Sequence, residues 1–167
     1  MLIVGLGGLG CASTLYLAAA GIGRLRLCDG DTVGRSDLNR QTLYSESSIG
    51  LFKVDEAGRR IARLNPSIVV EKFKVFVDSQ NARKLAEGCQ VIVDGLDNLE
   101  SRFVLNKESF RQRIPFVYGA VHGWLGYAGV FYAPQTACLA CLMHPDIVSR
   151  DRVPVAGITP GLIGLIQ

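Results

Sequence analysis

Short apolar runs rich in β-branched residues recur along the chain, with helix-like segments between several of them. Such runs are typical of strands buried on both faces of a sheet, where neither face can carry many polar side chains. Glycine, proline and small polar residues bound most of the runs. We therefore predict six strands, over residues 2–4, 24–28, 68–77, 90–94, 116–120 and 129–132.

Two segments between the predicted strands have helical patterns. Residues 9–20 are rich in alanine and leucine, and apolar residues in 54–64 recur at the three-to-four-residue spacing of one helix face. Strands that alternate with helices favour right-handed crossovers and a parallel sheet. We predict an α/β, Rossmann-like fold with a mostly parallel sheet and helices on both faces. Residues 1–167 are expected to form a single domain, truncated at both ends.

Composition narrows the class of protein further. The chain has 167 residues, of which 49% are hydrophobic and 20% charged, and this is typical of one globular domain. No apolar run approaches the roughly 18 residues of a membrane span, and the N-terminus lacks an export signal, so we expect a cytoplasmic location and no membrane. The net charge of +3 is spread without a basic stripe, which makes a nucleic-acid partner unlikely on sequence grounds.

The first candidate site is the glycine-rich turn Gly5–Gly10, which has the pattern G-x-G-x-x-G after a predicted strand and before a predicted helix. In that position the backbone can approach a phosphate, and the helix N-terminus offers free N–H donors. Asp29 follows the second predicted strand and suits ribose hydroxyls. The alternative is a glycine turn selected only for close helix-to-strand packing.

A polar run and a lysine follow the second predicted strand. Ser36–Gln41 contains Arg40, whose planar guanidinium suits phosphate oxygens, although a solvated arginine is equally compatible with the sequence. Lys53 lies near the start of the second helix, where it is either a solvated lysine or a point charge for a β- or γ-phosphate. These positions are candidates for a triphosphate site, and the solvated alternatives stay open at this point.

Asp97 and Asn98 follow the fourth predicted strand, at the edge of the sheet where ligands bind. Either residue suits the N-cap of a helix that begins near Leu99. A carboxylate at this edge is also suited to hold Mg²⁺ between phosphates. Capping and metal binding are compatible with each other.

Cys138 and Cys141 have the spacing of metal ligands. A structural zinc site needs four ligands, so we interpret the pair as half of a Zn²⁺ site that other residues complete. A chance pair and a redox C-x-x-C motif are the alternatives. Neither His122 nor His144 has a nucleophile beside it in the sequence, so we expect no histidine base.

The ordered motifs GLGGLG, DGDTV, SDLNRQ, GLFKV, LNP, GLDN followed by Arg102 and Asn106, and C-x-x-C resemble, along essentially the whole chain, the ThiF/MoeB/HesA family. The resemblance implies an ATP-binding enzyme that adenylates the C-terminal glycine of a ubiquitin-like sulfur carrier of the ThiS/MoaD type. The reaction releases pyrophosphate, in thiamine, molybdopterin or related sulfur-transfer biosynthesis. Members of this family act as homodimers, so we expect one here.

The resemblance also assigns roles to individual residues. It implies that Gly8 and Asp29 contact the adenosine and the ribose, and that a segment along the phosphates is formed by Ser36, Asp37, Leu38, Asn39 and Arg40. It implies that Lys53 binds phosphate and that Asp97, with Asn98 beside it, holds Mg²⁺. Cys138 and Cys141 correspond to the first half of a zinc site. Arg40, Lys53 and Asp97 are the expected catalytic residues, with ATP and Mg²⁺ as cofactors.

A terminal carboxylate is ionised at pH 7, with a reference pKa of about 3.5, so its attack on the α-phosphorus needs no general base. Two departures from the family pattern matter. Asp37 stands where many members have asparagine, and a carboxylate that does not face Mg²⁺ or solvent should weaken ATP binding. Residues 152–160 contain no cysteine, so we expect adenylation without covalent transfer of the carrier.

Three other functions remain open at this point. An NAD-dependent oxidoreductase shares the glycine motif but needs a nicotinamide pocket and a proton donor. An enzyme that adenylates a carboxylate on a modified tRNA nucleoside shares the chemistry but not the acceptor. A non-catalytic carrier-binding protein could keep the fold alone.

Overall fold

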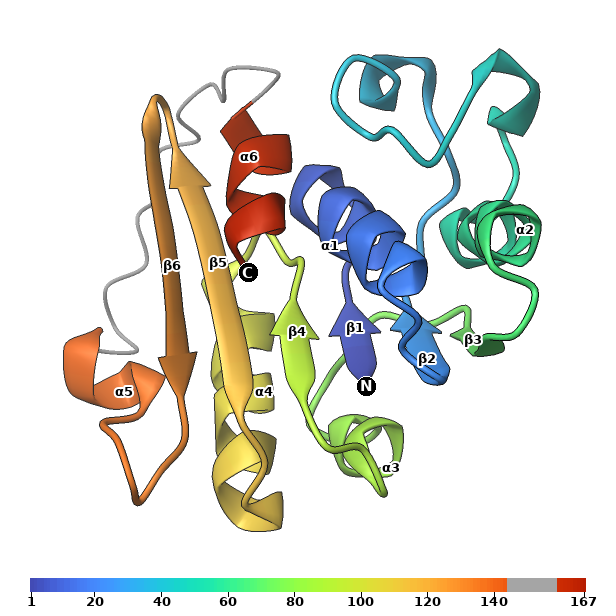
Figure 1. Ribbon diagram of the computed structural model, residues 1–167. Helices are drawn as coiled ribbons and strands as arrows, with labels where there is room; N and C mark the ends of the chain where they lie inside the picture. Colours follow the sequence, from blue (N-terminus) through green and yellow to red (C-terminus); the bar gives the residue numbers. More distant parts are fainter. Residues whose placement is uncertain (144–158) are drawn as a thin grey trace.

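Six strands form one sheet in the computed structural model, which describes residues 1–143 and 159–167 (Figure 1). The order across the sheet is β3-β2-β1-β4-β5-β6. The strands are β1 (Leu2–Val4), β2 (Arg24–Cys28), β3 (Val69–Phe73), β4 (Ile92–Asp94), β5 (Phe116–His122) and β6 (Leu125–Phe131). Strands β1 to β5 are parallel and β6 is antiparallel to β5, so the predicted Rossmann-like, mostly parallel sheet is confirmed.

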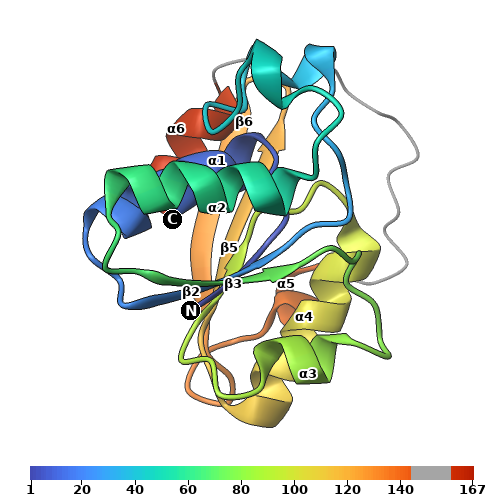
Figure 2. The same ribbon diagram turned by 90° about the vertical axis from the view of Figure 1, so that its right-hand side faces the viewer.

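Helices cover both faces of the sheet, as predicted (Figure 2). The α-helices are α1 (Gly8–Ala19), α2 (Lys53–Leu64), α3 (Ala82–Ala86), α4 (Leu99–Gln112), α5 (Leu139–Leu142) and α6 (Thr159–Ile166), and the short 3-10 turns are η1 (Arg35–Asp37) and η2 (Glu46–Ser48). In β1, Leu2 and Val4 pack with residues of α3 and α4, whereas Ile3 packs with residues of α1 and α2. This alternation is the period of two of a strand, with apolar side chains on both faces.

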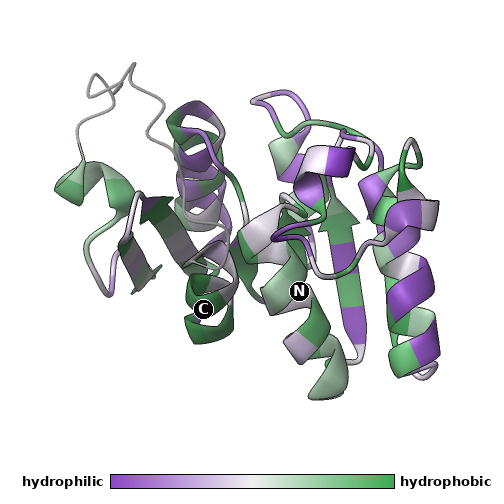
Figure 3. Cartoon of the chain, turned by 90° about the horizontal axis from the view of Figure 1, so that it is seen from above, coloured by the Kyte–Doolittle hydropathy of each residue, from purple (hydrophilic) through white to green (hydrophobic). Residues whose placement is uncertain are grey.

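The last helix, α6, lies against α1; Figure 3 shows α6 mostly in the green of apolar residues and α1 in paler green and white. The two helices pack so closely that a Cβ on Gly164 would lie 2.3 Å from the carbonyl oxygen of Leu9. Ser13 Oγ donates to Gly164 O across this contact, at 2.9 Å. None of the described helices combines the length and the apolar character that crossing a membrane demands.

The structure corrects three details of the predicted elements. The third strand ends at Phe73 instead of residue 77, so Val75 and Phe76 lie in a loop at the carboxyl edge of the sheet. Strand β6 begins at Leu125 instead of 129, because backbone pairing with β5 extends through glycines that interrupt the apolar pattern. Helix α3 was not predicted, since its five residues are too few to show a helical period. His144 and most of the segment 152–160 lie outside the described residues.

Candidate functional site

The glycine-rich turn joins β1 to α1 and packs against the loop after β4. Gly5 has φ +86°, and a Cβ there would lie 2.6 Å from the backbone of Gly95. A Cβ on Gly10 would lie 1.8 Å from Gly5 O. Close packing therefore explains these two glycines. Helix α1 has no side-chain N-cap, so its first N–H groups have no cap acceptor and can donate to an anion.

Gly8 is placed differently from the other glycines of the turn. A Cβ at Gly8 would lie 2.6 Å from Pro160 of α6 and 3.6 Å from Cγ of Arg40. The expected adenosine contact thus borders two segments that are distant in the sequence. It lies within reach of the Arg40 side chain.

Asp29, at the end of β2, holds the turn in place. Its Oδ2 accepts a hydrogen bond from Leu6 N at 2.7 Å, and its Oδ1 accepts one from Asp31 N at 2.8 Å. Burial raises the pKa of this carboxyl above its usual value, against the opposing effect of these two hydrogen bonds. Each carboxylate oxygen keeps acceptor capacity for a ribose hydroxyl.

Two buried side chains that the sequence analysis did not select also support the turn. Tyr44 donates its hydroxyl hydrogen to Leu6 O at 2.9 Å. Gln41 donates from Nε2 to Asp37 Oδ1 at 3.0 Å, while its Oε1 has no hydrogen-bond partner among the described residues. The Gln41 amide lies beside Gly7, where a Cβ would be 3.9 Å from Nε2. Their only sequence signal is position, because Gln41 ends the polar run and Tyr44 follows it by three residues.

Lys53 and Arg40 converge on Asp37. Lys53 is the first residue of α2, and its side chain is only 7% exposed, so the solvated alternative is wrong. Its Nζ lies 3.3 Å from Asp31 Oδ2 and 3.7 Å from Asp37 Oδ2. Arg40 Nη2 lies 3.5 Å from Asp37 Oδ1, and Arg40 Nη1 donates to Ser36 O at 2.9 Å and to Asn39 Oδ1 at 3.0 Å. Asp37 therefore faces two cations rather than bulk solvent.

The loop after β4 presents Asp97 at the carboxyl edge of the sheet. Asn98 is the N-cap of α4, and its Oδ1 accepts from Ser101 N at 2.9 Å, as the capping interpretation predicts. Asp97 is exposed and forms no hydrogen bond or ion pair with any residue of the described part of the chain. An exposed carboxylate in this position has the chemistry that a Mg²⁺ ligand needs.

Arg102 of α4 holds the loop after β4 in place, a role that its sequence position alone did not indicate. Its Nε donates to Asp94 Oδ2 at 2.9 Å, and its Nη2 donates to Leu96 O at 2.5 Å and to Gly119 O at 2.7 Å. Asp94 is fully buried, and this burial raises its pKa to about 6 against the opposing charge of Arg102. The ion pair connects β4, β5 and the Asp97 loop.

Phe76 is another residue that the sequence analysis missed, because it was assigned to a strand. The Phe76 side chain is 67% exposed, and its ring lies against Gly30, where a Cβ would be 2.7 Å from ring carbons. An exposed aromatic ring beside the acid at the end of β2 is suited to contact a flat, apolar ligand group.

Cys138 and Cys141 lie on and beside α5, with their sulfur atoms 3.6 Å apart. Two thiolates on one tetrahedral Zn²⁺ would be about 3.8 Å apart, given Zn–S bonds of about 2.3 Å. The pair therefore fits half of a zinc site. The backbone N–H of Leu139 donates to Asn106 Oδ1 at 2.9 Å, which fixes α5 to α4. Within residues 1–143 and 159–167, no group of three or more His, Cys, Asp or Glu side chains surrounds a common point.

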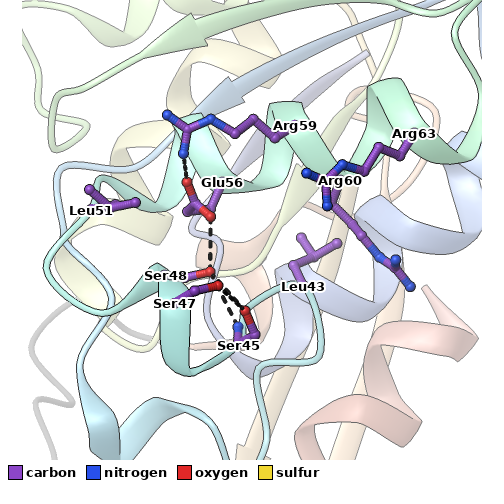
Figure 4. A pocket seen from close by; sticks show the side chains of 9 residues that line it. All are labelled: Leu43, Ser45, Ser47, Ser48, Leu51, Glu56, Arg59, Arg60 and Arg63. Carbon is purple, nitrogen blue, oxygen red and sulfur yellow. Dashed lines mark hydrogen bonds and ion pairs between the residues drawn. The ribbon is translucent and has the colours of Figure 1, made fainter.

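A polar hollow of about 240 Å³ lies between η2 and α2 (Figure 4). Its walls bond to one another, since Glu56 pairs with Arg59 and accepts from Ser48 Oγ at 2.9 Å. The lining residues are Leu43, Ser45, Ser47, Ser48, Leu51, Glu56, Arg59, Arg60 and Arg63. None of the residues expected from the sequence lines it, so this hollow is beside the candidate site and not part of it.

Known proteins resemble the chain along its whole length. It is 36% identical to the SAMP-activating enzyme E1 of Haloferax volcanii, and the match covers all of this chain and 63% of that protein. It is 38% identical to the molybdopterin-synthase adenylyltransferase of Salmonella typhimurium, over 99% of this chain and 67% of that protein. The chain thus spans about two thirds of the length of these relatives.

Solved structures agree on the fold. The E. coli protein MccB with ATP matches 98% of this chain and 52% of its own, with a TM-score of 0.87 at 23% identity. The E. coli tRNA N6-threonylcarbamoyladenosine dehydratase TcdA in complex with ATP matches 74% of this chain and 52% of its own, with a TM-score of 0.71 at 30% identity. The ThiF family model matches residues 1–167. On these grounds the chain belongs to the ThiF family.

Proposed function

We propose that the protein transfers the AMP group of ATP to the C-terminal glycine carboxylate of a ubiquitin-like sulfur carrier, with release of pyrophosphate. One observation carries the proposal: buried Lys53 and half-buried Arg40 converge on Asp37, and Arg40 lies beside Gly8 at the uncapped, glycine-rich N-terminus of α1. Two cations and free backbone donors at one point favour a polyphosphate. The names of the relatives from H. volcanii and S. typhimurium support the same chemistry.

The proposal assigns each part of ATP to residues of the candidate site. We place the triphosphate along Ser36–Arg40 and Lys53, and the ribose at Asp29. The adenine is placed near Gly30, with the Phe76 ring against it, because base-to-aromatic contacts are favourable for any base. Gly8, the expected adenosine contact, borders the phosphate segment through its approach to Arg40.

The attacking group is a carboxylate that is already ionised, so no side chain has to remove a proton. One carboxylate oxygen forms a bond to the α-phosphorus, and the bond from that phosphorus to the bridging oxygen of pyrophosphate breaks. Lys53 and Arg40 stabilise the charge that develops on the leaving pyrophosphate. Mg²⁺, when bound, would neutralise phosphate charge, and the exposed carboxylate of Asp97 with Asn98 beside it fits its ligation.

We also propose a structural Zn²⁺ held by Cys138 and Cys141 together with two further ligands from elsewhere, as the sulfur-to-sulfur distance allows. A homodimer belongs to the same proposal. Its support is the edge strand β6, where Leu125, Tyr127 and Val130 expose apolar side chains. Light scattering coupled to gel filtration distinguishes monomer from dimer.

The experiment for the proposed function is ATP–pyrophosphate exchange with labelled pyrophosphate and ubiquitin-like proteins that end in Gly-Gly. Exchange that requires the free C-terminal carboxylate supports carrier adenylation. One second candidate function is the adenylation of a carboxylate on a modified tRNA nucleoside. The ATP complex of TcdA, which is 30% identical to this chain, favours it. Exchange that needs such a tRNA instead of a carrier would establish that candidate. Hydride transfer to a nicotinamide cofactor without any exchange would establish an oxidoreductase.

A further inference from the structure

Asp37 lies between Lys53 and Arg40, the two cations that the proposed function assigns to phosphates. Its Oδ2 lies 3.7 Å from Lys53 Nζ and accepts from Gly34 N at 3.0 Å. Its Oδ1 lies 3.5 Å from Arg40 Nη2 and accepts from Gln41 Nε2 at 3.0 Å. The side chain is 14% exposed, so these contacts are only partly screened by water. One carboxylate thus satisfies both cations at once.

The formal charges of the four side chains Lys53, Arg40, Asp37 and Asp31 cancel. Asp31 also faces Lys53, at 3.3 Å, so two carboxylates stand against two cations. A polyphosphate that reaches Lys53 and Arg40 approaches Asp37 as well, and like charges at this distance repel strongly in a partly buried site. Phosphate binding therefore requires that Asp37 gives up part of its present contacts.

We propose that Asp37 is an internal competitor for the phosphate subsite, which holds Lys53 and Arg40 in the free protein and lowers the affinity for polyphosphates. The inference rests on the proposed function only for the assignment of these two cations to phosphates. The same competition favours the release of pyrophosphate, because the carboxylate returns to the cations as the product leaves. Asp37 is a residue that tunes affinity and not a catalytic residue.

The test compares the protein with its Asp37→Asn variant, using inorganic tripolyphosphate without metal as the probe and calorimetry to measure Kd. Asparagine keeps an acceptor for Gly34 N, and the Gln41 amide can flip so that its Oε1, which has no partner among the described residues, accepts from the new amide. The variant should therefore fold. Because a like charge is removed, we expect tripolyphosphate to bind about tenfold more tightly.

Asp55→Asn is the matched control. It removes the same charge from α2, but Asp55 pairs with Lys72 and Lys74, at 2.8 and 2.7 Å. Its tripolyphosphate Kd should equal that of the unchanged protein. Thermal unfolding gives a second readout: without ligand, Asp37→Asn should lower Tm, because two cations lose their partner, and saturating tripolyphosphate should remove or reverse this difference.

Equal or weaker tripolyphosphate binding by Asp37→Asn would overturn the proposal, and so would the absence of measurable binding by both proteins. A gain that appears equally in Asp55→Asn would show a general charge effect and overturn it too. If the protein binds tripolyphosphate as expected but catalyses no ATP–pyrophosphate exchange, the proposed function fails while the competition by Asp37 stands.

Discussion

Lys53 Nζ lies 3.7 Å from Asp37 Oδ2, and this pair connects the first residue of α2 to the last residue of η1. The lysine side chain is almost fully buried, so its charge is removed from water at a cost in free energy. Its interactions with Asp31 and Asp37 offset that cost. A buried cation at the carboxyl edge of a parallel sheet is rare unless it is paired or binds a ligand. The relationship has consequences that can be measured.

Substituting Lys53 by methionine keeps the length of the side chain but removes its charge. If Lys53 stabilises the leaving pyrophosphate, the rate of ATP–pyrophosphate exchange should fall by about a hundredfold or more. Lys72→Met is the control, because Lys72 is exposed and pairs with Asp55. A Lys53→Met variant that keeps more than half of the exchange rate would exclude Lys53 from the reaction.

Arg102 anchors the Asp97 loop through a buried ion pair. Replacing it with methionine leaves the Asp94 carboxylate buried without its partner, so the free energy of unfolding should fall by about 3–5 kcal/mol in urea titrations. Arg35→Met, which affects an exposed arginine paired with the exposed Glu46, should cost less than about 1 kcal/mol. Equal effects of the two substitutions would contradict the anchoring role.

The pKa of Asp94 predicts a specific pH dependence of stability. Burial raises this pKa to about 6 in the folded protein, against a value of 3.8 without the shift, so between these values the folded state binds the extra proton. The contribution of Asp94 therefore becomes more favourable as pH falls from 6 toward 4, by up to about 3 kcal/mol, and is lost as pH rises through 6.

Comparing the protein with Asp94→Asn at each pH isolates this contribution from that of the other carboxyls. The difference in free energy of unfolding between the two should shift in favour of the unchanged protein as pH falls from 6 to 4. A difference that stays constant across this range would show that Asp94 does not titrate there.

Phe76→Ala tests the proposed base contact separately from the phosphates. Loss of a stacked ring should raise the KM for ATP by about tenfold and leave tripolyphosphate binding unchanged. Phe110→Ala is the control, because this phenylalanine is also exposed but lies in the last turn of α4, which leads into the start of β5. If both ligands bind more weakly to Phe76→Ala, the substitution has disturbed the loop instead of a base contact.

Local patterns were sufficient to predict the sheet and the helices on both of its faces. Leu2–Val4 is apolar on both sides, and the glycine turn, the polar run and Asp97 each follow a predicted strand, so parallel pairing brings them to one edge. The roles proposed for these residues rest on that edge and on the family, and they remain predictions that the experiments above test.

Long-range partners could not be predicted from the sequence. The burial of Lys53 depends on Asp31 and Asp37, and the role of Arg102 depends on Asp94 and Gly119, which come together only when the sheet has formed. Phe76 was missed for a simpler reason. An apolar run after β3 looks like a continued strand, although the chain leaves the sheet at Phe73.

The central claim is that a carrier carboxylate receives AMP at this site. The most direct measurement incubates the protein with ATP, Mg²⁺ and a ubiquitin-like carrier that ends in Gly-Gly, and then determines the mass of the carrier. The account predicts a carrier heavier by one AMP, formed together with pyrophosphate and absent when the carrier lacks its terminal glycine. A carrier of unchanged mass, with no pyrophosphate released, would contradict it.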